Sequence, residues 1–360
     1  MWHTADLTMQ VTKNEWNMLC KSKKFHYNNQ GKRAKLYCND YKDQGVVVEV
    51  CMLGRGSEDY QAYLVKMTVN FSKLLKDKEH IELASDSDNE HVISHLEGII
   101  AELFEGIEDN ESPVGYSIEL SSFQLSRLDY TLQVRGLSKE EIHLYLRALQ
   151  KGDVRAFKAV KDRWRHEIKQ PYKDSFYMEN DSVTINIYDK QSQVCNRHYD
   201  EAVIQAASGI LRIEIQCKAP KLGSIKRRGK YKVSTRDVLS FLSSEISEEL
   251  IKKYLKKITK TKPYYPLDTI KTGINKSSYR KQKKDRLLAL VQEMSKKGKR
   301  LSDVWKDLYQ EDSSRFRVDI AAIEELGFNP IPLPEKHGLP SEKIPLPNLL
   351  DRLFDGSKNN

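Results

Sequence analysis

Three stretches of the chain alternate apolar and polar residues with a period of two, which is typical of strands with one buried face. They are SRLDYTLQV (126–134), SVTINIYDK (182–190) and ILRIEIQCK (210–218). In the second stretch, Val183, Ile185 and Ile187 form the apolar row, and Tyr188 lies in the polar row. A chain with three such stretches is constrained to place them in a sheet.

The polar rows of these stretches carry side chains that can take part in catalysis. They contain Asp129, Tyr188 and Glu214, one on each stretch. If the strands join one antiparallel sheet, we expect these three side chains on a common open surface. We interpret this constellation as a candidate active site.

Further charged residues stand close to the three in sequence. Lys190 shares the face of Tyr188 if that strand continues, where it could stabilise developing charge or lower the pKa of the tyrosine. Arg127 and Arg212 could orient the carboxylates or contact a phosphate. Glu119, just upstream, is a possible extra ligand. The structural alternative is that each strand carboxylate forms a solvated pair with an arginine on the next strand.

The residue types suit phosphodiester chemistry. Cleavage of DNA needs the phosphate charge to be neutralised, a nucleophile in line and stabilisation of the transition state. Asp129 and Glu214 are hard oxygen ligands suited to Mg²⁺ or Mn²⁺. Tyr188 could attack the phosphorus and form a phosphotyrosine. Tyr199, which we expect on a helix with acidic neighbours, is the rival nucleophile.

Positive charge is concentrated in two regions. Residues 251–300 contain 17 Lys or Arg and three acidic residues, and residues 218–232 contain seven Lys or Arg and no acidic residue. We expect the second region to be a loop beside the sheet. A polyanion such as DNA is the natural partner, although lysine-rich helices can also be only solvated faces. The candidate DNA-binding residues are Arg127, Arg212, Lys226, Arg227, Arg228, Lys230, Arg280, Lys281, Lys283 and Lys284.

Composition and length bound the architecture. A chain of 360 residues is expected to divide into two or three units. We predict an α+β fold, with an antiparallel sheet core carrying helices on one face, followed by a helical C-terminal region. The predicted parts are an N-terminal α+β part (1–112), a catalytic core (113–233), a basic helical DNA-binding region (234–330) and a Pro-rich tail (331–360).

The location and redox state follow from what the sequence contains. The sequence has no run of roughly 18 apolar residues and no basic and apolar leader at its start, which indicates a cytoplasmic protein. The five cysteines include no CxxC pair, and we expect reduced thiols and no zinc site.

Local patterns predict the other elements. Strands are expected at 5–11, 33–38, 45–53 and 61–71, and near 176–179. VGYSIEL (114–120) could form a hairpin with the strand that bears Asp129. Helices are expected at 12–21, 92–107, 138–149, 154–168, 197–209, 234–242, 244–258, 284–298 and 301–310. Asp88 or Asn89 is the expected cap of the second helix, and Ser138 and Glu141 form a capping box at the start of the third. The last two helices, joined by KKGKR, could form a helix-turn-helix. Closely spaced prolines exclude regular structure from FNPIPLPEKHGLP (328–340), which we expect to be a linker or a surface strap.

The motifs RLDYT, INIYDKQ and LRIEIQ, in this order, resemble the core of rolling-circle replication initiators of plasmids, integrative elements and phages. They also resemble gene II replication proteins of filamentous phages. The resemblance covers residues of about 120–220. Two departures are that no H-x-H strand is present and that Asn186 stands where an arginine often precedes the tyrosine.

The resemblance implies a metal-dependent, origin-specific nickase. Such an enzyme binds double-stranded origin DNA, cuts one strand through tyrosine, stays on the 5′ phosphate and leaves a 3′ hydroxyl as primer. Tyr188 would be the nucleophile, and Asp129 and Glu214 would bind the metal. The implied partners are a host helicase and polymerase, and a homodimer is possible. A conjugative relaxase with the same chemistry and a non-catalytic DNA-binding regulator are the alternatives.

Overall fold

The computed structural model describes residues 1–27, 35–53, 62–75, 81–107, 118–152, 174–234 and 237–354. The fold is α+β, with an antiparallel sheet and a helical C-terminal region, as predicted. The strands are β1 (Trp2–Val11), β2 (His26–Tyr27), β3 (Lys35–Cys38), β4 (Val46–Leu53), β5 (Ala62–Asn70), β6 (Gln124–Val134), β7 (Ser175–Glu179), β8 (Val183–Asp189) and β9 (Leu211–Lys218). Their order in the sheet is β2-β3-β4-β5-β1-β6-β9-β8-β7.

The chain forms two compact units. The first comprises Met1–Leu132, Asp181–Thr184 and Ile215–Glu249, and the second comprises Gln133–Asn180, Ile185–Glu214 and Leu250–Asn360. The predicted boundaries at residues 112, 233 and 330 stay predictions. Among the described residues, the structure contains no helix with the length and apolar character that crossing a bilayer requires.

In the first unit, β1 pairs antiparallel with β5 on one side and with β6 on the other. Its alternation places Ala5, Leu7, Met9 and Val11 in the core, since each of these side chains is at most 5% exposed. The opposite row of the sheet carries the polar residues. Strand sequences of period two therefore separate an apolar face from a polar one, as expected.

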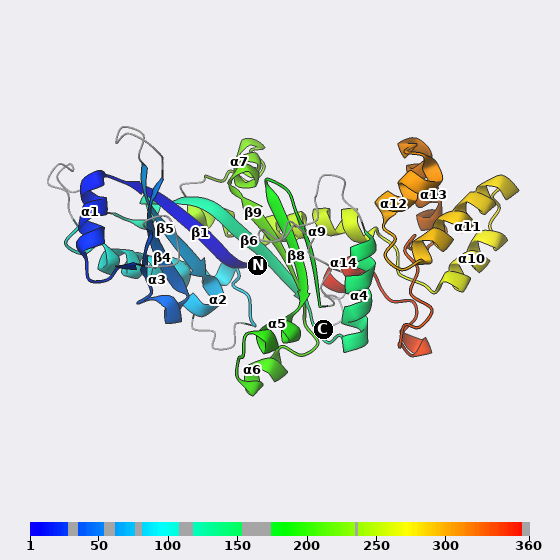
Figure 1. Cartoon of the computed structure of the whole chain (residues 1–360), viewed down its shortest axis with the longest axis horizontal. Helices are drawn as coiled ribbons and strands as arrows, with labels where there is room; N and C mark the ends of the chain where they lie inside the picture. Colours follow the sequence, from blue (N-terminus) through cyan, green and yellow to red (C-terminus); the bar gives the residue numbers. More distant parts are fainter. Residues whose placement is uncertain are drawn as a thin grey trace. The chain divides into compact units, whose positions relative to one another are not determined.

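The helices of the first unit are α1 (Lys13–Lys21), α2 (Phe71–Leu74), α3 (Asn89–Leu103), α7 (Ala219–Arg227) and α8 (Val238–Phe241), with the first residues of α9 (Ser244–Thr259). Thr12 and Glu15 form a capping box that starts α1, which packs on β4 and β5 (Figure 1). Asp88, one of the two residues expected to cap this helix, is the N-cap of α3.

The second unit contains β7, the larger part of β8, and the remaining helices. These are α4 (Lys139–Lys151), α5 (Lys190–Asn196), α6 (Glu201–Ala206), most of α9, α10 (Leu267–Lys276), α11 (Lys281–Ser295), α12 (Leu301–Tyr309), α13 (Ser313–Glu325) and α14 (Leu349–Phe354). The predicted capping box of Ser138 and Glu141 starts α4.

Helices α10 to α13 pack on one another in the second unit (Figure 1). The fully buried carboxylate of Asp319 on α13 accepts hydrogen bonds from Arg286 of α11, at 3.0 and 3.1 Å, and from the hydroxyl of Tyr309 on α12, at 3.0 Å. One buried acid thus joins three helices, and its charge is balanced by the guanidinium. Helices α11 and α12 are the pair that the sequence predicted around KKGKR.

Several local predictions are wrong. The basic region 218–232 was expected to be a loop, but Ala219–Arg227 forms α7, with Pro220 in its first turn. Of the hairpin strand expected at 114–120, residues 118–120 are not in a strand, and a 3-10 turn begins at Leu120 (Leu120–Ser122). Residues 114–117 lie outside the described residues. The segment 328–340 has no helix or strand, as predicted, yet Asn329 and Ile331 are at most 1% exposed, so it is not a surface strap. The helix expected at 154–168 lies outside the described residues.

Candidate active site

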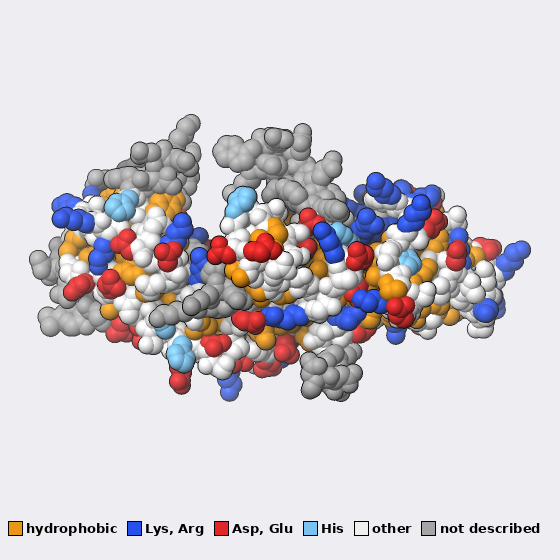
Figure 2. Space-filling view, turned by 90° about the horizontal axis from the view of Figure 1, so that it is seen from below, with side chains coloured by type: hydrophobic (Ala, Val, Ile, Leu, Met, Phe, Trp, Pro, Cys, Tyr) orange, Lys and Arg blue, Asp and Glu red, His pale blue; other side chains and the backbone are white. Residues whose placement is uncertain are grey.

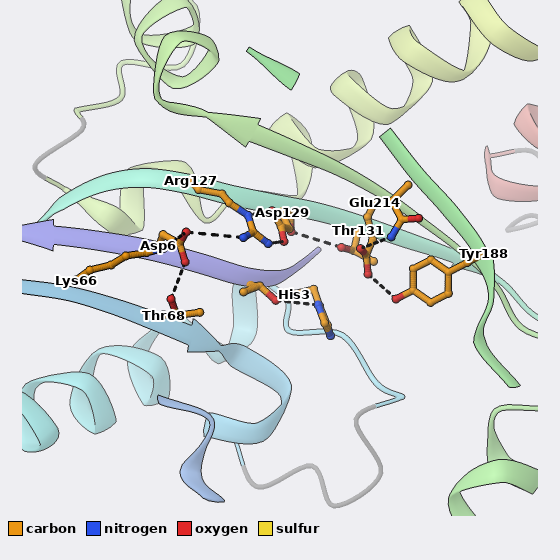
Figure 3. Close-up of polar contacts among 11 residues, drawn as sticks. His3, Asp6, Lys66, Thr68, Arg127, Asp129, Thr131, Tyr188 and Glu214 are labelled. Carbon is orange, nitrogen blue, oxygen red and sulfur yellow. Dashed lines mark hydrogen bonds and ion pairs between the residues drawn. The ribbon is translucent and has the colours of Figure 1, made fainter. Parts of the chain in front are cut away.

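Tyr188 and Glu214 meet in the second unit (Figure 3). The Tyr188 hydroxyl donates a hydrogen bond to Oε1 of Glu214, with an oxygen–oxygen distance of 2.6 Å. Two residues before Tyr188 on β8, the Asn186 amide nitrogen lies 3.4 Å from Oε2 of the same carboxylate. The period-two alternation of β8 thus directs Asn186 and Tyr188 to one carboxylate on β9, while Ile185 and Ile187 enter the core.

These side chains are buried, not on the open surface that the sequence led us to expect. Tyr188 and Glu214 are each 5% exposed, and Arg212, two residues before Glu214 on β9, is fully buried. Arg212 donates a hydrogen bond to Oε1 of Gln133 at 3.1 Å. A fully buried arginine in this position cannot contact a DNA phosphate, so its predicted role in DNA binding requires a change in structure.

The surroundings of Tyr188 set its protonation state. Burial raises the pKa of its hydroxyl well above the ordinary value of 10, and the negative charge of Glu214 raises it further. The Arg212 guanidinium acts in the opposite direction, because it favours the phenolate. At neutral pH the hydroxyl is therefore protonated. Glu214, which already accepts its hydrogen bond, is placed to take the proton.

Lys190 does not share the face of Tyr188, because β8 ends at Asp189. Asp189 is the N-cap of α5, and its carboxylate accepts a hydrogen bond from the backbone N–H of Gln191 at 3.0 Å. Lys190 is the first residue of that helix, is 3% exposed, and donates to Oε1 of Gln193 at 2.8 Å. The prediction that it acts from the strand face is wrong, since it assumed that the strand persisted.

The rival tyrosine, Tyr199, lies between two helices. It is half-buried and follows α5, and α6 begins at Glu201, so Tyr199 is not on a helix as predicted. Its backbone N–H donates to the carbonyl of Val194 at 3.3 Å.

In the first unit, Asp129 is held by an arginine two residues away on β6 (Figure 3). Nε of Arg127 lies 2.8 Å from Oδ1 of Asp129, and its Nη2 binds Oδ2. The guanidinium also lies 3.7 Å from Oδ2 of Asp6 on β1. Asp129 is 1% exposed, so this pairing is what compensates for its burial.

Sequence reasoning missed Asp6, a second buried carboxylate in the same polar row. Asp6 is 6% exposed and accepts from the Thr68 hydroxyl at 2.8 Å and from Nζ of Lys66 at 2.9 Å, both on β5. The register pairs Asp6 with Arg127 on one side and with Thr68 on the other. The signal was an aspartate at a polar position of a predicted strand, but β6 is more than 100 residues away in sequence.

The carboxylates that the sequence assigned to a metal are held by protein donors within their own units. Asp129 belongs to the first unit and binds Arg127, and Glu214 belongs to the second and binds Tyr188. Across the described ranges, no three His, Cys, Asp or Glu side chains group in a way that could hold a metal ion. In this arrangement the Arg127 guanidinium binds Asp129 and the Tyr188 hydroxyl binds Glu214. The predicted convergence of Asp129 and Glu214 on Mg²⁺ or Mn²⁺ stays a prediction. Glu119 is exposed and precedes β6, at the start of a 3-10 turn.

The remaining basic candidates lie on two helices. Lys226, Arg227 and Arg228 are exposed at the C-terminal end of α7, and Lys230 beyond them forms an ion pair with Glu249. The second group, at the start of α11, comprises Arg280, Lys281, Lys283 and Lys284. Within it, Nζ of Lys284 donates to the carbonyl of Asn275, and Nζ of Lys283 lies 3.7 Å from the ring centre of Tyr279. Lys and Arg side chains are also visible at the surface over the C-terminal helices (Figure 2).

Comparison of the chain with protein-family models, curated proteins and solved structures identifies no match.

Proposed function

We propose that this chain nicks and rejoins one DNA strand through Tyr188 to initiate rolling-circle replication of an extrachromosomal or mobile element. The observation that carries the proposal is the hydrogen bond from the Tyr188 hydroxyl to Glu214. It joins a nucleophile to a proton acceptor, the relation that activation of a hydroxyl requires. The order of the three strand motifs and the exposed basic end of α7 support the same reading. An initiator of this kind would work in the cytoplasm.

The proposed reaction exchanges one phosphodiester for another. The Tyr188 oxygen attacks the phosphorus and its proton passes to Glu214, while the bond from phosphorus to the 3′ oxygen breaks. That oxygen takes up a proton from the solvent and leaves as the 3′ hydroxyl, and the 5′ phosphate stays on tyrosine. Arg212 stabilises negative charge on the phenolic oxygen, since its positive charge offsets part of the rise in the pKa of Tyr188 that burial and Glu214 cause. The reverse sequence rejoins the strand.

One observation favours the alternative of a non-catalytic DNA-binding regulator. Tyr188 is 5% exposed, and a phosphodiester can reach its hydroxyl only after neighbouring side chains move. A hydrogen bond from a buried tyrosine to a carboxylate is equally consistent with a purely structural role, because it satisfies both the hydroxyl and the carboxylate. In that case DNA would bind only through exposed cations such as Lys226, Arg227 and Arg228.

The test is formation of a covalent adduct. Single-stranded oligonucleotides tiled across the DNA beside the encoding gene are labelled at the 3′ end and incubated with the full chain. Parallel reactions contain Mg²⁺, Mn²⁺ or a chelator, and denaturing gels reveal labelled protein. We expect Tyr188→Phe to abolish the adduct while DNA binding persists, and Glu214→Gln to slow its formation roughly 10²-fold or more, as expected for loss of a general base.

Matched variants identify the nucleophile. Tyr199→Phe and Tyr177→Phe should form the adduct like the unmodified chain, since Tyr177 is 40% exposed on β7 and is not part of the site. An adduct that survives Tyr188→Phe but is lost in Tyr199→Phe would reassign the nucleophile. If the unmodified chain binds the DNA and forms no adduct under any of the three conditions, the regulator alternative is correct.

A further inference from the structure

The second unit contains a cavity of about 570 Å³ that the proposed reaction does not use. The C-terminal half of α4, the turn between α11 and α12, and the proline-containing segment 331–334 line it. Pockets of roughly 300–1,000 Å³ are the usual size for small-molecule and cofactor sites. The cavity is therefore large enough for a ligand of nucleotide size.

The charged side chains that line the cavity are all cations. They are Arg147, Lys151, Lys297, Lys299 and Arg300, and no Asp or Glu is among the lining residues. Lys299 is partly neutralised by an ion pair with Asp307. Arg147 and Lys297 are exposed, and among the described residues neither forms an ion pair. Among the described residues, two cations of the cavity thus have no acidic partner and can bind an anion.

The helix ends beside the cavity add to this positive charge. Nζ of Lys151 donates to the carbonyls of Met294 and Lys296, at the C-terminal end of α11. It thereby neutralises the partial negative charge of that helix end. The next helix, α12, begins at Leu301 and turns its partial positive end toward the same turn. Desolvation of Lys151 lowers its pKa to about 8, so it remains mostly charged at neutral pH.

The floor of the cavity is apolar. It consists of Leu144 and Ala148 of α4 and of Ile331, Pro332 and Leu333. Each of these side chains is largely buried, with Ile331 only 1% and Leu333 3% exposed. An anion bound to the exposed cations would therefore place an uncharged part against these apolar side chains. The ligand must combine a strongly anionic group with a compact apolar body.

We propose that this cavity binds a nucleotide unit, with its phosphate at Arg147 and Lys297 and its base against the apolar floor. A base has the flat apolar faces that such a floor accepts, and a phosphate carries the charge that several cations require. The nucleotide can be free or one unit of a DNA strand, since both present the same chemistry. The site consists of its own residues and does not rest on the nicking reaction.

The test is isothermal titration calorimetry of the full chain with a series of ligands. The ligands are dAMP, the 5′-phosphorylated hexanucleotide of deoxyadenosine, deoxyribose 5-phosphate, inorganic phosphate and decanoate. We expect saturable binding of dAMP, of the hexanucleotide, or of both. Arg147→Ala and Lys297→Ala should each weaken it about tenfold, the effect of losing one charged contact. Lys306→Ala, an exposed cation of α12 outside the cavity, should leave it unchanged.

The ligand series separates the possible results. Deoxyribose 5-phosphate should bind at least roughly fivefold more weakly than dAMP, because it lacks the base. Tighter binding of the hexanucleotide identifies a DNA strand as the source, and equal or tighter binding of dAMP identifies a free nucleotide. Equal affinity for phosphate and dAMP, tighter binding of decanoate, no binding of either nucleotide, or unchanged affinity in both cavity variants would overturn the proposal. Tyr188→Phe should bind like the unmodified chain, so loss of nicking and loss of this site are distinguishable.

Discussion

Glu141 connects the start of α4 to the C-terminal segment of the second unit. The contribution of its contacts to stability can be predicted quantitatively. Its carboxylate is 2% exposed in the structure. It accepts hydrogen bonds from the backbone N–H of Ser138 at 2.8 Å, from Nζ of Lys343 at 3.0 Å and from Nη2 of Arg352 at 3.0 Å. Glu141→Gln retains the shape and one acceptor oxygen but removes the charge that holds the two cations.

The expected loss in the free energy of unfolding follows from those three contacts. A hydrogen bond to a charged group contributes about 1.5–3 kcal/mol when it is well shielded. The side chains of Lys343 and Arg352 are 44% and 36% exposed, so each of their contacts is reduced to about 1 kcal/mol by solvent. The Gln oxygen can still accept from Ser138. We therefore expect Glu141→Gln to cost about 2 kcal/mol at pH 7.

This contribution depends on pH with a defined sign. Burial alone raises the pKa of Glu141, but the hydrogen bond from Ser138 and the charge of Lys343 lower it overall, below its ordinary value of 4.5. A carboxyl whose pKa is lower in the folded state stabilises the fold above the unfolded pKa. That stabilisation is lost as the pH falls through the folded pKa. The difference between the unmodified chain and Glu141→Gln should therefore shrink below about pH 4.5.

Urea unfolding at pH 7 and at acidic pH measures this difference. Glu140→Gln is the matched control, because Glu140 is an exposed acid in the same helical turn. We expect the control to change the unfolding free energy by less than about 0.5 kcal/mol at either pH. If Glu141→Gln behaves like the control at pH 7, or if its deficit is as large at acidic pH, the reasoning on these charged contacts is refuted.

Three further variants test packing and a buried charge. Gly98→Ala should stabilise α3 by about 0.5–1 kcal/mol, because nothing lies near the added methyl. Gly273→Ala should destabilise α10 by about 1 kcal/mol or more, because the methyl would meet the ring of Phe328; thermal unfolding of the two variants measures these opposite signs. Asp319→Asn should cost about 2 kcal/mol in urea unfolding, since Arg286 then loses the charge that it pairs with, and an unchanged midpoint would contradict this.

The sequence predicted those parts of the fold that depend on local periodicity. The alternating stretches that end at Val11, Leu53 and Asn70 are strands, and the capping box at Ser138 starts a helix, because these signals arise from neighbouring residues. The predictions that are wrong are those in which a second local signal outweighed the one that was used. Asp189 caps a helix where a strand was expected to continue, and Pro220 begins a helix in a region read as a loop. Proline in the first turn of a helix is favourable, since no backbone donor is lost there.

The candidate site could be predicted only in part, because its contacts come from distant segments. Alternation identifies which residues share a row, and it correctly places Tyr188 toward Glu214. It does not reveal what lies over that row, so the burial of Tyr188 and Glu214 could not be predicted. The pairing of Asp6 with Arg127 depends on a register between strands far apart in sequence.

Because the Tyr188–Glu214 hydrogen bond is buried, Tyr188→Phe can change the stability of the fold as well as its activity. The size of the stability change separates the possible roles of the bond. If the bond serves stability alone, Tyr188→Phe removes the 2.6 Å hydrogen bond to a buried carboxylate and should cost about 1–3 kcal/mol. If the site is organised for catalysis, the carboxylate is held beside a proton that it must later accept, and functional sites often retain such arrangements at the expense of stability. Tyr188→Phe would then change the unfolding free energy little while it abolishes the adduct. Measuring both quantities on the same variant therefore tests the role of the tyrosine more strictly than the loss of activity alone, since an unfolded variant would also lose activity.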